Sequence, residues 1–162
     1  MTNSYHFITN WRIAGRREVV YDIVRDALHY PEWWSKVYLS VEELEHGAEN
    51  EVGRRFCLHT KGWLPYTLRW EALTTQADPP NRLVIQAFGD FDGRGIWSVK
   101  QNGDFVDVTF DWKLTAEKPL LKHLSFLLKP LFSANHRWAM EQGRRGLQSE
   151  IKRRSALERC PK

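Results

Sequence analysis

The stretch that decides the fold is "DFVDVTFDWKLTAEKPLLKHLSFLLKPLF", residues 104–132, because the spacing of its apolar residues changes within it. From residue 104 to residue 114 apolar and polar residues alternate, which is typical of a strand with one buried face. From Pro119 onward apolar residues recur every three or four positions, and proline suits the first turn of a helix. The stretch therefore predicts a last strand followed directly by a C-terminal helix that runs to about residue 157.

The alternation of this strand repeats upstream in five further segments, which are separated by short turns rich in Gly, Pro, Asn and Asp. A first strand is predicted over residues 5–14, and an amphipathic helix covers roughly 16–28. Pro31 lies close behind that helix and fits the start of a second short helix. The five strand segments are residues 36–44, 53–60, 65–73, 81–91 and 95–101.

This order of elements predicts an α+β fold. A curved antiparallel meander of about seven strands, with two short helices after strand one, has one face to cover, and a long helix is available to cover it. Because a long sheet twists, we expect it to wrap around that helix. Pro130 should kink or divide the helix, and Gly143 within it indicates a close approach to the sheet. The whole chain, residues 1–162, is expected to form one domain.

The composition argues against several classes of protein. The net charge is +4, and much of the excess lies in "EQGRRGLQSEIKRR", residues 141–154. We interpret this stretch as the solvated face of a helix, so no nucleic-acid partner is expected. The chain has two cysteines and no apolar run long enough to span a membrane, and its first residues, without a basic start and a long apolar run, lead us to expect no signal peptide. A cytoplasmic protein is therefore expected.

Two adjacent tryptophans stand at the joint between the short helices and the second strand, in "HYPEWWSKV", residues 29–37. Neighbouring residues of a helix point about 100° apart, so both rings should not share one direction. We expect Trp34 to be the core anchor and Trp33 to be the more exposed ring, close to the mouth of any cavity.

The order of elements and two local motifs resemble the START or SRPBCC superfamily with the helix-grip fold, which includes the polyketide cyclase/dehydrase-like proteins. "REVVYDIVRDALHYPEWWSKV", residues 17–37, is similar to the helix pair that leads into the second strand of that superfamily. "GDFDGRGIW", residues 89–97, is similar to its Gly-rich turn between strands five and six. The resemblance covers essentially the whole chain. It implies a hydrophobic cavity between sheet and C-terminal helix for lipids, polyketides or other apolar molecules, but no shared catalytic residues.

Strand parity and the apolar stripe of the C-terminal helix select the candidate ligand-binding residues. Most of the inward rings are expected to be core. Together, large rings facing a glycine-bearing helix indicate a wide gap near Phe132 and His136, where Asn135 supplies an amide. The predicted ligand-binding residues are Trp33, Tyr66, Trp70, Trp97, Phe110, Trp112, Phe132, Asn135, His136 and Met140.

His136 is the one titratable residue of that helical stripe. It is interpreted as a core histidine with satisfied hydrogen bonds, as a polar anchor for a ligand, or as a general acid/base. The first hypothesis is therefore a protein that binds an apolar small molecule. The alternative is a polyketide cyclase/dehydrase-like enzyme with His136 as acid/base, and catalytic residues stay unassigned. No histidines pair four residues apart, so neither a metal nor a cofactor is expected.

The segment "LLKHLSFLLKPLF", residues 120–132, is apolar nearly all round. We favour a helix that packs on the opening of the sheet. The alternative is a helix that contacts a membrane surface, with Lys122 and Lys129 at its edge. The sequence does not give the oligomeric state.

Overall fold

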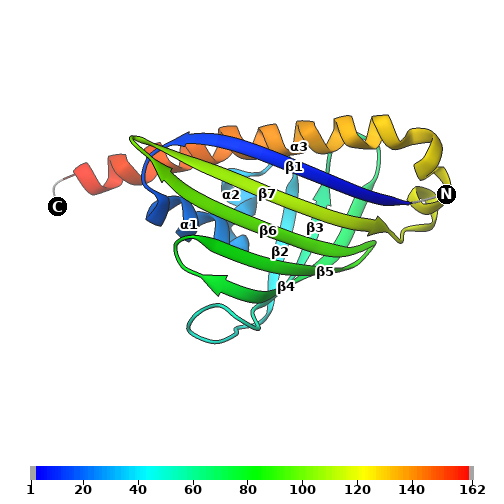
Figure 1. Ribbon diagram of the computed structural model, residues 1–162, viewed down its shortest axis with the longest axis horizontal. Helices are drawn as coiled ribbons and strands as arrows, with labels where there is room; N and C mark the ends of the chain where they lie inside the picture. The colour runs from blue at the N-terminus through cyan, green and yellow to red at the C-terminus, as the bar shows by residue number, and fades with distance from the viewer. Residues whose placement is uncertain (1–2, 161–162) are drawn as a thin grey trace.

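The computed structural model describes residues 3–160, without the side chains of Leu120, Ser125 and Phe126. Within these residues, seven strands and a long C-terminal helix enclose one interior, and short helices lie between the first two strands (Figure 1). The strands are β1 (Ser4–Ala14), β2 (Tyr38–Glu45), β3 (Arg55–Lys61), β4 (Thr67–Asp78), β5 (Arg82–Gly89), β6 (Phe91–Asn102) and β7 (Phe105–Ala116). The helices are α1 (Arg17–Arg25), α2 (Tyr30–Trp33) and α3 (Pro119–Arg159), with a 3₁₀ turn over Ala27–His29.

The strands form a single antiparallel sheet in the order β1-β7-β6-β5-β4-β3-β2. Strands two to seven are a meander, and β1 pairs with β7 along its whole length, from Ser4 opposite Thr115 to Ala14 opposite Phe105. Figure 1 shows the sheet curving, with α3 running along its open side. The α+β helix-grip fold predicted from the order of elements is confirmed.

The alternation of apolar and polar residues predicted for β7 agrees with the burial of its side chains. Val106, Val108, Phe110 and Trp112 are buried, whereas the residues between them are only partly buried. Each buried apolar side chain of this size contributes about 1.5–3 kcal/mol relative to an exposed one. The inward side chains therefore hold β7 to the interior, and they do so at the positions that the period of two predicts.

α3 is continuous through Pro130, so the proline does not divide it, although the ribbon bends near its N-terminal end (Figure 1). Gly143 has the close contact that its sequence position predicts, but the nearest atoms belong to Trp34, the residue that follows α2. A β-carbon at Gly143 would lie 2.4 Å from Cζ2 of Trp34 and 3.0 Å from Cη2 of Trp11 in β1. The glycine therefore seats the Trp34 ring against the helix.

Trp34 is the more deeply buried ring of the pair, as predicted, but Trp33 is not exposed either. Trp33 and Trp34 are both buried, at 8% and 3% exposure, and their rings stack at a centroid distance of 5.3 Å. The reason is that α2 ends at Trp33, and Trp34 has φ −119° and ψ 41°, outside the helical region. The angle between neighbours on a regular helix therefore does not apply, and both rings turn toward α3.

The Gly-rich segment also differs from its predicted role as a turn. Gly93 and Gly95 lie inside β6, and the chain reverses earlier, between Gly89 and Phe91. A β-carbon at Gly93 would lie 2.0 Å from the carbonyl oxygen of Lys113, and one at Gly95 would lie within 3.0 Å of the Phe110 and Trp112 rings. These glycines therefore allow close packing within the sheet, which a sequence motif does not distinguish from a turn.

Among residues 3–160, the structure contains no helix that is both long enough and apolar enough to cross a lipid bilayer.

Candidate functional site

A cavity of about 180 Å³ lies between the concave face of the sheet and α3. It extends from a small apolar cluster built on Tyr5, Ala116 and Leu121 to Val24 and Arg25 of α1. Its walls are predominantly aromatic and aliphatic, as expected for a site that takes an apolar molecule. The aromatic part of the wall includes Phe7, Tyr30, Trp34, Tyr38, Phe56, Tyr66, Trp70, Phe91, Trp97, Phe110, Trp112 and Phe132.

The structure brings all but one of the predicted ligand-binding residues to the wall of this cavity. Tyr66, Trp70, Trp97, Phe110, Trp112, Phe132, Asn135, His136 and Met140 line it. Trp33 does not; its carbonyl oxygen packs against Gly146 of α3, and Trp34 faces the cavity in its place. Trp34 is therefore the more deeply buried ring, as expected, and also the ring that lines the cavity, which was expected of Trp33.

His136, on the wall of this cavity, carries a buried polar atom without a partner among the described residues. Its ring stacks on Phe7, with centroids 4.1 Å apart and planes 18° from parallel. Its Nε2 atom is enclosed and makes no hydrogen bond to the part of the chain described. Burial, and to a smaller extent the charge of Arg137, lowers the pKa of His136 from 6.5 to about 4. The imidazole is therefore neutral at physiological pH.

The lowered pKa of His136 predicts how stability depends on pH. The unfolded chain takes up a proton near pH 6.5, whereas the folded protein does so only near pH 4. Because the unfolded state binds more protons in this window, the free energy of unfolding should fall as pH drops from 6.5 to 4, by about 3 kcal/mol. Urea unfolding of the wild type and of His136→Phe at several pH values checks this. A difference between the two that is constant with pH would contradict a neutral, buried His136.

Two tyrosine hydroxyls add polar groups to the wall of the cavity. Within the described residues, neither Tyr38 nor Tyr66 makes a side-chain hydrogen bond, whereas the Tyr30 hydroxyl donates to the carbonyl oxygen of Val24. Burial raises the pKa of Tyr66 to about 12, with a smaller contribution from Tyr5, and burial also raises that of Tyr38. Both tyrosines are therefore neutral donors at physiological pH.

Asn135 has a different role from the one its position predicted. Its Oδ1 atom accepts hydrogen bonds from the backbone N–H groups of Trp63 at 2.8 Å and Leu64 at 3.3 Å. It therefore fastens the loop between β3 and β4 to α3 and shapes that end of the cavity. A β-carbon at Gly62 would lie 2.1 Å from the same oxygen, so the glycine allows this contact.

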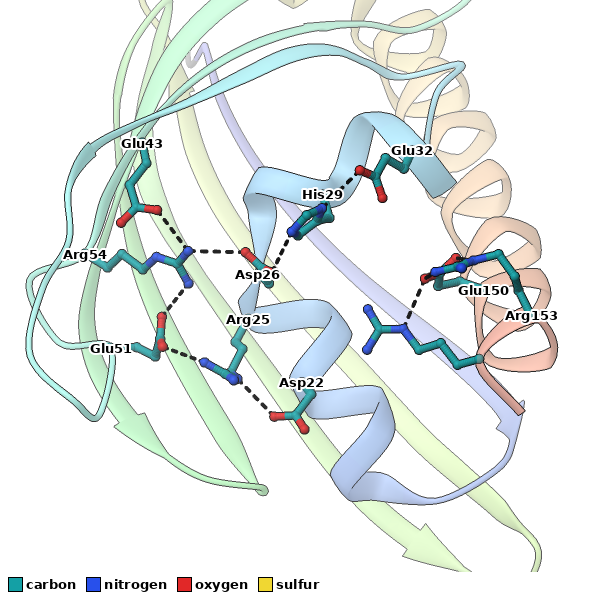
Figure 2. Close-up of polar contacts among 11 residues, drawn as sticks. Asp22, Arg25, Asp26, His29, Glu32, Glu43, Glu51, Arg54, Glu150 and Arg153 are labelled. Carbon is teal, nitrogen blue, oxygen red and sulfur yellow. Dashed lines mark hydrogen bonds and ion pairs between the residues drawn. The ribbon is translucent and has the colours of Figure 1, made fainter. Parts of the chain in front are cut away.

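At the other end of the cavity, an ionic network joins the end of α1, strand β2 and the loop before β3 (Figure 2). Arg54, whose side chain is 11% exposed, contacts Asp26 at 3.2 Å, Glu43 at 3.0 Å and Glu51 at 2.7 Å. Arg25 contacts the other oxygen of Glu51 at 2.5 Å, and it also lines the cavity. The positive charge of Arg25 is therefore neutralised by carboxylates of the protein.

Several residues of the wall carried a signal that sequence reasoning did not use. Phe56 and Leu58 alternate with Arg55 and Cys57 in β3, so strand parity places them inward. Phe7 alternates in the same way in β1. Tyr30 and Tyr38 carry no such signal, because they flank an irregular joint whose direction depends on the local backbone.

Comparison with known proteins agrees with this architecture. A family model described as polyketide cyclase / dehydrase and lipid transport matches residues 9–152. No curated protein matches the sequence.

Solved structures with the same fold include a protein from Thermus thermophilus, which has 19% identity and a TM-score of 0.78 over 93% of this chain and 99% of that one. The Zhui aromatase/cyclase from a Streptomyces species has 15% identity and a TM-score of 0.69, over 94% and 96% of the two chains. A START superfamily protein from Mycobacterium smegmatis has 14% identity and a TM-score of 0.67, over 91% and 97%. At these identities the likeness is one of fold.

Proposed function

Because the chain belongs to the polyketide cyclase / dehydrase and lipid transport family, we propose that it binds a small, neutral, apolar molecule with a hydroxyl or carbonyl group. The site is the cavity between the sheet and α3. The observation that carries the proposal is His136, which lines the cavity and whose buried Nε2 atom has no hydrogen-bond partner among the described residues. A buried polar group without a hydrogen bond costs about 1–3 kcal/mol, and a ligand that supplies the bond removes this cost.

The size of the cavity favours a compact ligand. A water molecule needs about 10–15 Å³ of such volume, so 180 Å³ corresponds to on the order of a dozen waters. This volume suits a molecule of two or three fused rings and is small for a lipid with two acyl chains. The flat rings of Trp97, Phe110 and Trp112, stacked on one another along the wall, suit an aromatic or polycyclic ligand.

The charges around the cavity favour a neutral ligand. Arg25 is already paired with Glu51 and Asp22, and Lys61 is exposed at the edge of the site. His136 and the two tyrosines are neutral at physiological pH, so they offer hydrogen bonds but no charge. A carboxylate placed among the aromatic walls, away from Lys61 at the edge, would lose its hydration without gaining an ion pair.

Calorimetric titration with 2-naphthol, a neutral bicyclic alcohol, tests the proposal. We expect one molecule per chain to bind to the wild type, and His136→Phe to weaken the binding about tenfold because a hydrogen bond is lost. Naphthalene, which lacks the hydroxyl, is the matched ligand, and its affinity should be nearly the same for both proteins. Naphthalene-2-carboxylate should bind more weakly than 2-naphthol. Equal loss of affinity for naphthol and naphthalene in the variant would refute the role of His136 as an anchor.

A second candidate function is a polyketide cyclase/dehydrase-like enzyme that uses the same cavity. The observation in its favour is that Tyr66 and His136, whose Nε2 atom has no partner among the described residues, both line one apolar cavity. A pKa of about 4 makes His136 a weak base and leaves it without a proton to donate at neutral pH, so binding is favoured over acid–base catalysis. Turnover of a linear polyketide-like substrate by the wild type and its loss in His136→Ala, with ligand binding retained, would instead establish the enzyme.

A further inference from the structure

Large apolar side chains gather at one end of the molecule. Of the ten large apolar side chains that are exposed in the described part of the chain, five lie on the N-terminal half of α3, in the β3–β4 loop and in β2. We call these five the apolar rim. Leu127 is 67% exposed and Trp63 is 46% exposed, which are high values for such side chains. The apolar rim consists of Leu39, Trp63, Leu124, Leu127 and Leu131.

The members of the apolar rim are neighbours in space. Leu124, Leu127 and Leu131 follow one another at three- and four-residue steps on α3, so they share a face of the helix. One turn further on, Asn135 binds the backbone of Trp63 and Leu64, which brings the loop between β3 and β4 against this part of α3. A shallow groove joins Trp63 to Leu39 of β2, and Trp138 of α3 lines it as well.

The apolar rim lies at the end of the ligand cavity. Tyr66 and Gly62 line both the cavity and the shallow groove beside Trp63. Leu121 and Phe132, which also line the cavity, belong to the same segment of α3 as the three rim leucines. A molecule that leaves the cavity at this end therefore meets the rim.

The charge around the apolar rim is mostly positive, although Asp90 and Glu117 pair with Lys118 and Lys122 at the start of α3. Residues 33–41, 59–70 and 118–140, which carry the rim, contain no aspartate or glutamate. Lys36 and Lys61 are exposed, line the groove with Trp63, and form no ion pair with any residue of the described chain. An apolar surface bordered by unpaired lysines is complementary to the headgroups and acyl boundary of an anionic bilayer.

We propose that the apolar rim docks on an anionic membrane surface and so places the end of the cavity at the bilayer. A second copy of this chain suits the rim less well. A twofold contact would bring the same unpaired lysines of two chains together, with no carboxylate from these segments to neutralise them. The proposal does not depend on the identity of the cavity ligand.

Flotation with vesicles tests this surface in the full-length protein. We expect the wild type to float with vesicles of phosphatidylcholine and phosphatidylglycerol, and to float much less with phosphatidylcholine alone. Leu127→Glu should reduce the bound fraction about tenfold, because it places a carboxylate at the lipid boundary. Lys36→Glu should reduce binding to the anionic vesicles and leave the residual binding to neutral ones unchanged.

The matched control is Leu157→Glu, because Leu157 is 61% exposed on the same helix but lies at its opposite end (Figure 1). It should float like the wild type, and all variants should keep the wild-type melting temperature.

Failure of the wild type to float, equal flotation with neutral vesicles, or equal losses in Leu127→Glu and Leu157→Glu would overturn the proposal. So would light scattering that shows a dimer which Leu127→Glu dissociates, since the rim would then be an interface between copies. Binding of 2-naphthol in solution should be the same in Leu127→Glu, which separates this result from the proposed function.

Discussion

Replacement of Gly143 with alanine is expected to lower the free energy of unfolding by at least about 2 kcal/mol, although alanine is the better helix former. The gain in helix propensity is about 1 kcal/mol. Against it stands the new β-carbon, which would lie 2.4 Å from Cζ2 and 2.5 Å from Cε2 of Trp34. The ring cannot move away freely, because its Nε1 donates a hydrogen bond of 2.9 Å to the carbonyl oxygen of Ala139. Urea unfolding measures the loss.

Two further variants show whether the contact with Trp34 is responsible. Ser149→Ala, at an exposed position of the same helix, should change the free energy of unfolding by less than about 0.5 kcal/mol. Trp34→Phe removes the ring atoms nearest to Gly143. The double variant Trp34→Phe/Gly143→Ala should therefore lose less free energy of unfolding than the two single variants lose together, by about 1 kcal/mol or more. Additive losses would show that the alanine acts somewhere other than at this ring.

Removal of the Arg54 side chain is the second change with a large expected effect. In Arg54→Ala, three carboxylates that now share one guanidinium, Asp26, Glu43 and Glu51, lose that contact, and of the arginines only Arg25 still binds one of them, Glu51. The guanidinium also covers the Phe56 ring at 4.7 Å, and Phe56 lines the cavity. Loss of a largely buried ion pair of this kind costs about 3 kcal/mol, so thermal unfolding should occur at a clearly lower temperature.

Arg153→Ala is the matched control, because Figure 2 draws both arginines in contact with carboxylates but Arg153 is 56% exposed. Its partner Glu150 keeps a second contact of 3.0 Å with Arg154. The control should melt at the wild-type temperature, since exposed ion pairs contribute little. If Arg54→Ala were as stable as Arg153→Ala, the network would not hold the loop to α1.

The fold could be predicted because its elements repeat simple periods over long stretches. The alternation in β7 and the change of period at Pro119 depend only on which residues are apolar, and both agree with the structure. The rings of Trp70, Trp97 and Trp112 could be assigned to the interior for the same reason, since neighbouring residues of a strand face opposite sides of a sheet.

The details that sequence reasoning missed depend on contacts between distant segments. The orientation of Trp33 and Trp34 is fixed by the irregular backbone after α2 and by Gly143 and Gly146, more than a hundred residues away. The use of Asn135 as a fastening for the β3–β4 loop depends on the bend of that loop at Gly62. No periodic pattern within either segment contains this information.

A variant that fills the space between the sheet and α3 shows whether this space is a binding site. Ala139 lies on the wall of the cavity, and its carbonyl oxygen, which holds Trp34, is unaffected by a larger side chain. We predict that calorimetry shows saturable binding of 2-naphthol to the wild type, with a negative heat-capacity change, and none to Ala139→Phe at an unchanged melting temperature. Absence of saturable binding to the wild type, or equal binding to the filled variant, would contradict the account.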